Sequence, residues 1–149
     1  MLVEASYYLD TSALVKRYVE EPYSDKVDQL FSQAYRGIGV ISLSHWNIGE
    51  AVVVFDKYQR RIGIDSKRLT RSMLREMKTL SRLNRVKIIG ITPGILKESI
   101  KLVLEHHIYL ADALQIPSAK KAKATLVTGD RKLAETARKQ GLKTVYLGK

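Results

Sequence analysis

Short apolar runs alternate along the chain with longer segments in which apolar residues recur at helical spacing. The short runs contain the β-branched and aromatic residues typical of buried strands, and they cover residues 6–9, 39–42, 86–89, 125–127 and 143–147. The helical segments between them cover residues 13–19, 24–35, 65–83, 92–107, 111–122 and 130–140, with a further helix that begins after Ser44 and carries Glu50. Proline removes a backbone donor, so we expect a disturbance at Pro117 within residues 111–122.

Strands separated by helices imply a parallel sheet with helices on both faces. The predicted fold is therefore a three-layer α/β/α domain with a central, mostly parallel sheet of four or five strands. The chain shows no internal repeat and no linker rich in Gly, Ser or Pro, so we expect one domain over residues 1–149.

Two aspartates follow predicted strands directly. Asp10 comes after residues 6–9, and Asp130 comes after residues 125–127 and the turn Thr128-Gly129. In open parallel sheets, ligands bind beyond the carboxyl ends of the strands. We therefore expect Asp10 and Asp130 to point into the same edge of the sheet.

Two further acids lie in apolar helical segments. Glu50 is followed by Ala-Val-Val-Val, and Asp112 stands in the run Ile-Tyr-Leu-Ala-Asp-Ala-Leu. A buried carboxylate without a partner is costly, and two carboxylates about 4 Å apart repel by roughly 4 kcal/mol at an effective dielectric of 20. A hard divalent cation compensates such charges, since Mg²⁺ and Mn²⁺ prefer oxygen ligands. The hypothesis is a pocket in which Asp10, Asp112 and Asp130 bind the metal and Glu50 acts as a ligand or a base.

Simpler roles compete with this hypothesis. Asp10 and Asp130 are also good helix caps, and for either one alone capping is as plausible as catalysis. The four acids taken together favour the pocket. Thr11, Ser12 and Thr128 carry hydroxyls beside these acids, so they are capping or turn residues that also have the chemistry to hold a phosphate oxygen or a metal ligand.

The chain is strongly basic, with a formal net charge of +11 and a pI near 9.9, which favours a polyanionic partner. Most of the surplus lies between Lys57 and Lys87, where eleven basic residues stand against only Asp65 and Glu76. A basic stripe recurs there at three- and four-residue steps and comprises Lys67, Arg71, Arg75, Lys78 and Arg82. The stripe is either a solvated outer face or an RNA-binding track for the phosphate backbone, and the scarcity of acids beside it favours the track.

Several classes are excluded or disfavoured by composition. The chain has no cysteine, so it has no disulfide, thiolate zinc site or catalytic thiol. Its apolar runs are far shorter than the roughly 20 residues of a membrane span, and its start lacks the basic head of a secretory signal. We therefore expect no membrane partner and a cytoplasmic location.

Four sequence segments together resemble PIN domains. Residues 8–14, YLDTSAL, are similar to the opening of that family, and Glu50 is similar to its helical glutamate. Asp112-Ala113-Leu114 resembles its aspartate-opened helix, and residues 126–130, LVTGD, resemble its Thr-x-Asp strand end. The chain departs from the family pattern at Pro117 and at the basic pair that follows Asp130.

The resemblance implies a metal-dependent endoribonuclease, a hydrolase of RNA phosphodiester bonds. In length the chain resembles the VapC-type toxins of toxin-antitoxin pairs, which implies a homodimer and a protein antitoxin. Two alternatives within the family are a non-catalytic RNA-binding module and an RNA-processing nuclease outside any toxin-antitoxin pair. A phosphoacceptor receiver domain ranks lower, because that class wants adjacent acids after the first strand, where this chain has Asp10-Thr11-Ser12.

Overall fold

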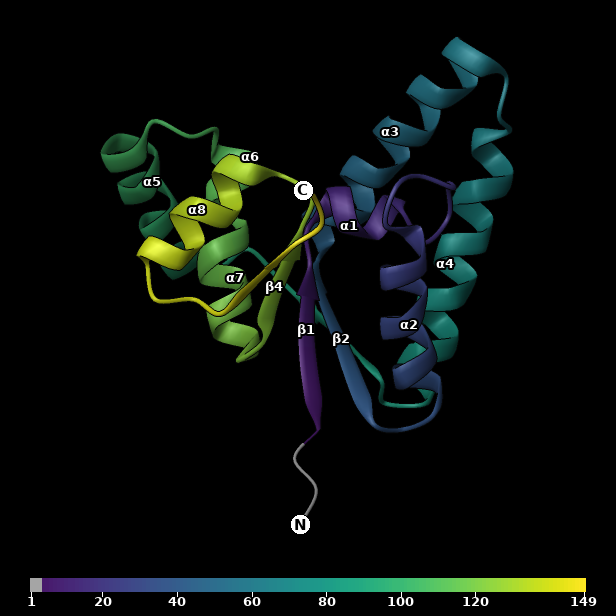
Figure 1. Ribbon diagram of the computed structural model, residues 1–149, viewed down its shortest axis with the longest axis horizontal. Coiled ribbons are helices and arrows are strands. Elements are labelled where there is room, and N and C mark those ends of the chain that lie inside the picture. The colour runs from purple at the N-terminus through teal and green to yellow at the C-terminus, as the bar shows by residue number, and fades with distance from the viewer. Residues whose placement is uncertain (1–3) are drawn as a thin grey trace.

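A parallel sheet forms the centre of the molecule. The computed structural model describes residues 4–149, and Figure 1 shows its elements. The strands are β1 (Ala5–Leu9), β2 (Gly39–Ser44), β3 (Val86–Ile89), β4 (Thr125–Thr128) and β5 (Thr144–Tyr146). They form a five-stranded sheet in the order β3-β2-β1-β4-β5, and every pairing is parallel. The predicted α/β/α class is confirmed, with a sheet that is parallel throughout the described residues.

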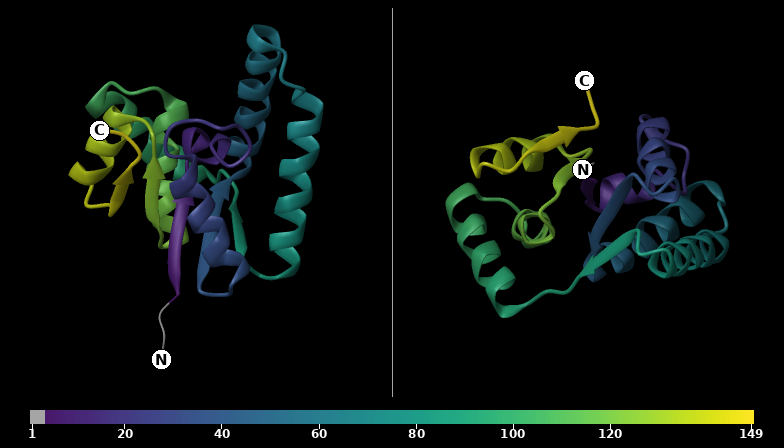
Figure 2. Two further views of the ribbon diagram at one scale, coloured as in Figure 1. Left: turned by 45° about the vertical axis from the view of Figure 1, so that its right-hand side comes forward. Right: turned by 90° about the horizontal axis from the view of Figure 1, so that it is seen from below.

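Helices cover both faces of this sheet. Figures 1 and 2 show one group on one side and a second group on the other. The first group comprises α1 (Thr11–Val15), α2 (Ser24–Tyr35), α3 (His45–Ile62) and α4 (Ser66–Arg82). The second comprises α5 (Pro93–His106), α6 (Leu110–Ala113), α7 (Gln115–Ala122) and α8 (Arg131–Lys139). None of the helices in residues 4–149 has the length and apolar character needed to cross a bilayer.

Each face of the sheet has its own apolar core, and β1 contributes to both. Successive side chains of a strand point to opposite faces. Leu9 accordingly packs in the cluster that includes Phe31 and Phe55, while Tyr8 packs in the cluster that includes Ile116 and Leu126. All these side chains are buried. The central strand is thus held from both sides, which fixes the position of Asp10 at its end.

Most helix boundaries follow local signals in the sequence. Ser44 caps α3 in a capping box with Asn47, Asp65 caps α4, and Thr92 caps α5 with Pro93 in the first turn. Gly63 ends α3 in the left-handed conformation, at φ 75°. The predicted elements at these places are confirmed.

Two predicted helices are corrected. The helix expected over residues 13–19 is α1, which begins at Thr11 and ends at Val15 before turns. The segment expected over residues 111–122 is divided into α6 and α7, with Leu114 between them. The break therefore lies one turn before Pro117, because the missing N–H of Pro117 leaves the carbonyl of Ala113 without its helical donor.

A polar cluster joins α4 to the start of the chain. Arg17 donates through Nε and Nη2 to the two carboxylate oxygens of Glu76, both at 2.9 Å, and its Nη1 lies 2.9 Å from Asp28. The hydroxyls of Tyr18 and Tyr35 also donate to Glu76, at 3.0 and 2.8 Å. These contacts lower the pKa of Glu76 against the opposing effect of burial. They fix α4, whose outer face carries the basic stripe, against α2 and the turn that follows α1.

Candidate functional site

The four acids named from the sequence line one cavity of about 440 Å³ at the carboxyl edge of the sheet. Asp10 stands at the end of β1, Glu50 on α3, Asp112 on α6, and Asp130 after β4. Because β1 and β4 are neighbouring parallel strands, their ends meet at one edge. The strand order also reverses direction at β1, which is where open α/β sheets form ligand crevices.

Asp10 is buried and fully hydrogen-bonded. Its Oδ1 accepts from the Ser12 hydroxyl at 2.7 Å and from the Ala13 amide at 2.9 Å, and its Oδ2 accepts from the Thr128 hydroxyl at 2.5 Å. Burial raises the pKa of this carboxyl, and the hydrogen bonds from Thr128 and Ser12 oppose the rise. The capping role and the placement in the cavity therefore coexist in Asp10.

Thr128 and Ser12 also connect the two strand ends. The Thr128 hydroxyl accepts from the Asp130 amide at 3.0 Å, and the Ser12 hydroxyl accepts from the Gly129 amide at 2.9 Å. Asp130 caps α8 by accepting from the Leu133 amide at 3.0 Å. The hydroxyls noticed in the sequence thus fix the segment after β4 against the segment after β1.

A buried amide network lies behind Glu50. Glu50 accepts from the Thr11 hydroxyl at 2.7 Å, and Thr11 in turn accepts from Asn47 Nδ2 at 3.0 Å. Asn47 Nδ2 also donates to Gln115 Oε1 at 2.9 Å, and the Tyr8 hydroxyl lies 2.8 Å from the same oxygen. This network fixes the distance between α3, which carries Glu50, and α7, which follows Asp112.

Asp112 is half-buried, and its charge is opposed by the other acids. Its pKa is raised from 3.8 to about 6, chiefly by burial and then by the charges of Asp130, Asp10 and Glu50, in that order. Lys132 is the charge that lowers it. The neighbouring acids thus add to the effect of burial, because each disfavours a second negative charge nearby.

The site carries excess negative charge that no ion pair removes. Within residues 4–149, none of Asp10, Glu50, Asp112 and Asp130 forms a salt bridge with lysine or arginine. Carboxylate and hydroxyl oxygens line the cavity, so the donor chemistry fits Mg²⁺ or Mn²⁺.

The side chains are not arranged as a finished coordination sphere. Among residues 4–149, no group of three or more His, Asp or Glu side chains has an arrangement that holds a metal ion. The reason lies in the hydrogen bonds, because Asp10 faces Ser12 and Thr128 while Glu50 faces Thr11. In the described structure the four acids therefore share one cavity, and metal binding by them stays a prediction.

Three further polar residues line the cavity and were not identified in the sequence. Lys16 lies four residues after Ser12, and its side chain is 12% exposed and 3.4 Å from Glu21. Glu21 also lines the cavity and accepts a short hydrogen bond from Tyr58. Gln115 lies three residues after Asp112 and therefore on the same side of the chain. Helical spacing from Ser12 and from Asp112 is the signal that could have identified Lys16 and Gln115.

The basic stripe lies apart from this cavity. Lys67, Arg71, Arg75, Lys78 and Arg82 are all exposed on α4. The opposite face of the helix buries Leu69, Met73, Met77 and Leu80. The amphipathic pattern is thus confirmed, and RNA binding by the stripe stays a prediction.

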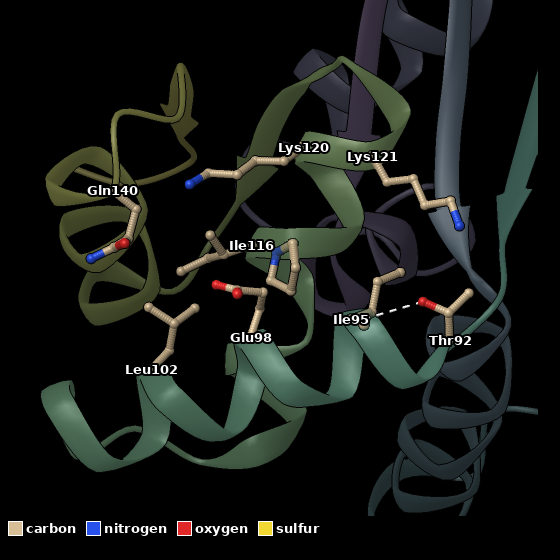
Figure 3. A pocket seen from close by; sticks show the side chains of 10 residues that line it. Thr92, Ile95, Glu98, Leu102, Ile116, Lys120, Lys121 and Gln140 are labelled. Carbon is tan, nitrogen blue, oxygen red and sulfur yellow. Dashed lines mark hydrogen bonds between the residues drawn. The ribbon is translucent and has the colours of Figure 1, made fainter.

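A different cavity, of about 400 Å³, lies between α5, α7 and α8 (Figure 3). Its apolar lining includes Ile95, Leu102 and Ile116, and its charged lining includes Lys120 and Glu98. The cavity contains one carboxylate and none of the four acids. Its chemistry therefore does not match the acidic site.

Comparison with known proteins identifies the family of the chain. The family model of the PIN domain matches residues 7–139. Comparison with curated proteins gives no match. The chain belongs to the PIN-domain family, whose members are nucleases, and this membership removes the receiver-domain alternative.

Solved structures share the fold at low sequence identity. PAE2754 from Pyrobaculum aerophilum is 22% identical with a TM-score of 0.64, and the match covers 95% of this chain and 84% of that one. VapC20 of Mycobacterium tuberculosis, a toxin that cleaves the sarcin-ricin loop, is 15% identical with a TM-score of 0.60, and the match covers 91% and 95%. VapBC2 from Rickettsia felis, bound to a DNA fragment from its promoter, is 20% identical with a TM-score of 0.61, and the match covers 95% and 98%.

Proposed function

We propose that the chain is an endoribonuclease that depends on Mg²⁺ or Mn²⁺ and is the toxin of a toxin-antitoxin pair. The observation that carries the proposal is the cavity lined by Asp10, Glu50, Asp112 and Asp130, four acids without a basic partner in the described residues. Membership of the PIN-domain family supports nuclease chemistry. The toxin assignment rests on the resemblance in length and on the similarity to toxin structures.

The chain's own residues position the reacting groups. A divalent ion held by these acids would lower the pKa of a bound water and neutralise charge on the phosphate. Asp10, Asp112 and Asp130 are the proposed ligands. Glu50 is a further ligand or the base that receives a proton from water, and its Oε1 is oriented by Thr11. The buried network behind Thr11 holds this hydroxyl against Glu50. Water is the proposed nucleophile, so no nucleophilic side chain is required.

The decisive experiment compares Asp10→Asn with the wild type for manganese-dependent cleavage of RNA and for growth arrest on expression. Asparagine is also a good helix cap, so the start of α1 is expected to persist while the charge is lost. We expect cleavage and growth arrest to disappear. Asp56→Asn, which changes an exposed acid outside the cavity, is the matched control and should keep both.

Two outcomes would contradict the proposal. Equal cleavage by Asp10→Asn and wild type would show that Asp10 has no role in catalysis. Strong cleavage in excess chelator would show that the reaction does not depend on a divalent metal ion. RNA binding without turnover would favour the non-catalytic RNA-binding module, and cleavage without growth arrest would favour an RNA-processing nuclease outside any toxin-antitoxin pair.

A protein antitoxin is the proposed regulatory partner. An inhibitor of this site needs basic groups, because the cavity has four acids that no basic residue pairs within the described chain. We therefore expect an antitoxin to place a basic side chain in the cavity or to cover its mouth. A purified antitoxin that silences the wild type but binds Asp112→Asn more weakly would support this role.

A homodimer is also proposed, and α5 offers the surface for it. Leu96, Ile100 and Leu104 recur at four-residue steps along α5 and are exposed, Leu104 by 71%. An exposed apolar stripe of this kind marks an interaction surface. Replacing Ile100 and Leu104 by Glu should shift the sedimentation coefficient to that of a monomer. Ile62→Glu, at the far end of α3, should leave it unchanged.

A further inference from the structure

A second cavity, of about 660 Å³, adjoins the acidic one. The two cavities share Thr11, Glu50 and Val54, so a ligand in the acidic cavity can extend past Glu50 into the second. Its remaining lining comprises His45, Trp46, Gly49, Val53, Lys57 and Ile91. The lining is mostly apolar and includes an aromatic ring, whereas the acidic cavity is lined by carboxylates.

One face of α3 forms most of this second cavity. Trp46, Gly49, Val53 and Lys57 follow one another at three- and four-residue steps, which places them on the same side of the helix. Trp46 is 42% exposed and Val53 is 55% exposed, although apolar side chains of this size are usually covered. Ile91, in the segment between β3 and α5, lines the cavity from outside α3.

Gly49 keeps the middle of that face open. Glycine is among the least favourable residues in a helix interior. A helix usually contains a glycine because the backbone needs a positive φ or because a neighbouring atom leaves no room for a Cβ. Neither reason applies to Gly49, whose φ is not positive and whose Cβ would meet nothing within 4 Å. Neither the backbone conformation nor the packing of α3 therefore requires a glycine at this position. Its effect is to leave a space one turn from Trp46 and next to Glu50.

We infer that this cavity is a subsite for an unstacked nucleobase of single-stranded RNA, next to the phosphodiester that the acidic cavity receives. The inference rests on the proposed nuclease function. Sequence-tolerant recognition of single strands uses an aromatic side chain on which a base stacks and a basic residue that meets the backbone. Trp46 supplies the ring, Lys57 the charge, and Gly49 the room for the base.

The chain provides its own reporter for the test. Trp46 is the only tryptophan in the sequence, so all tryptophan fluorescence comes from this cavity. The probe is a single-stranded uridine hexamer, compared with a hexamer of abasic ribose phosphate that has the same charge. Both are titrated into the wild type in excess chelator. Stacking should quench the fluorescence with the uridine hexamer and leave it unchanged with the abasic one.

Substitutions at Gly49 and Trp46 separate stacking from folding. Gly49→Leu fills the space with a better helix former, so its melting temperature should equal or exceed that of the wild type while its affinity for the uridine hexamer falls about fivefold or more. Trp46→Leu should weaken binding by about five- to a hundredfold, and Trp46→Phe should restore most of it. Ser32→Leu, which adds the same side chain to an exposed position of α2, is the control.

Defined outcomes would overturn the subsite. If the uridine and abasic hexamers bind equally to the wild type, or if Gly49→Leu retains wild-type affinity, no base occupies the cavity. A change of Trp46 emission on dilution of the protein, without a response to RNA, would assign the face to a second copy of the chain. A response only to a purified antitoxin would assign it to that partner. If the base-binding test fails and the wild type still cleaves RNA, only the subsite is refuted and the proposed nuclease function stands. If the wild type does not cleave RNA either, the proposed nuclease function fails as well.

Discussion

Replacing Asp112 by Asn should stabilise the protein and inactivate it together. The pKa of Asp112 is raised from 3.8 to about 6, chiefly by burial and then by the neighbouring acids. A folded-state pKa above the unfolded value means that ionisation of the group destabilises the fold. The cost is fully present above about pH 6 and disappears as the pH falls through about 4. Asparagine has nearly the same shape and carries no charge, so it removes this cost.

The magnitude follows from the shift. A rise from 3.8 to about 6 corresponds to about 3 kcal/mol at 1.36 kcal/mol per pKa unit. Asp112 is only half-buried, and solvent screening reduces the value to about 1–2 kcal/mol. In a chain of this size 1 kcal/mol moves the melting temperature by about 2–4 °C. We therefore expect Asp112→Asn to melt about 2–8 °C above the wild type at pH 8 in chelator.

The assay is thermal unfolding of both proteins at pH 8 and at pH 4, with RNA cleavage measured in parallel. The difference in melting temperature should be clear at pH 8 and nearly absent at pH 4, while cleavage by the variant is lost. Asp56→Asn is the control, since its exposed carboxylate pairs only with Arg60 on the surface. An Asp112→Asn protein less stable than wild type at pH 8 would show that the acids do not repel one another as described.

Mg²⁺ or Mn²⁺ should reverse the order of stability. An ion that binds only the folded state adds about 2.7 kcal/mol at a hundred times its dissociation constant. The wild type should gain most of this in a thermal melt, and Asp112→Asn much less. An equal rise in both proteins would mean that the ion binds elsewhere.

The remaining predictions concern the framework and the basic stripe. Glu76→Ala removes the acceptor of four hydrogen bonds and should cost about 2–4 kcal/mol of unfolding free energy in urea, whereas Glu98→Ala, an exposed acid, should cost almost nothing. Ser44→Ala removes the cap of α3 and should cost about 1 kcal/mol in the same assay. Arg71→Glu combined with Arg75→Glu should weaken RNA binding and flatten its dependence on salt, and an unchanged affinity and slope would dismiss the track.

Local patterns in the sequence were sufficient to predict most helices and strands and the edge of the sheet at which the site lies. The caps at Ser44, Asp65 and Thr92 were identifiable because capping involves residues at most three apart. Asp10 and Asp130 were placed at one edge because parallel strands end on the same side. The sequence predicted a helix disturbance at Pro117, but the helix is divided at Leu114. The reason is that proline lacks the N–H that would bond to the carbonyl four residues earlier.

Tertiary structure alone decided how distant side chains meet. The hydrogen bond from Thr128 to Asp10 joins residues 118 apart, and that between Asn47 and Gln115 joins residues 68 apart. No periodicity in the sequence specifies such contacts, because they depend on the strand order and on the packing of α3 and α7 across β1. The sequence thus determined which oxygen donors the protein has and on which elements they lie. Packing brought hydroxyl groups within reach of Asp10 and Glu50. Each carboxylate points toward a hydroxyl, because a hydroxyl can donate a hydrogen bond to it whereas a second carboxylate repels it.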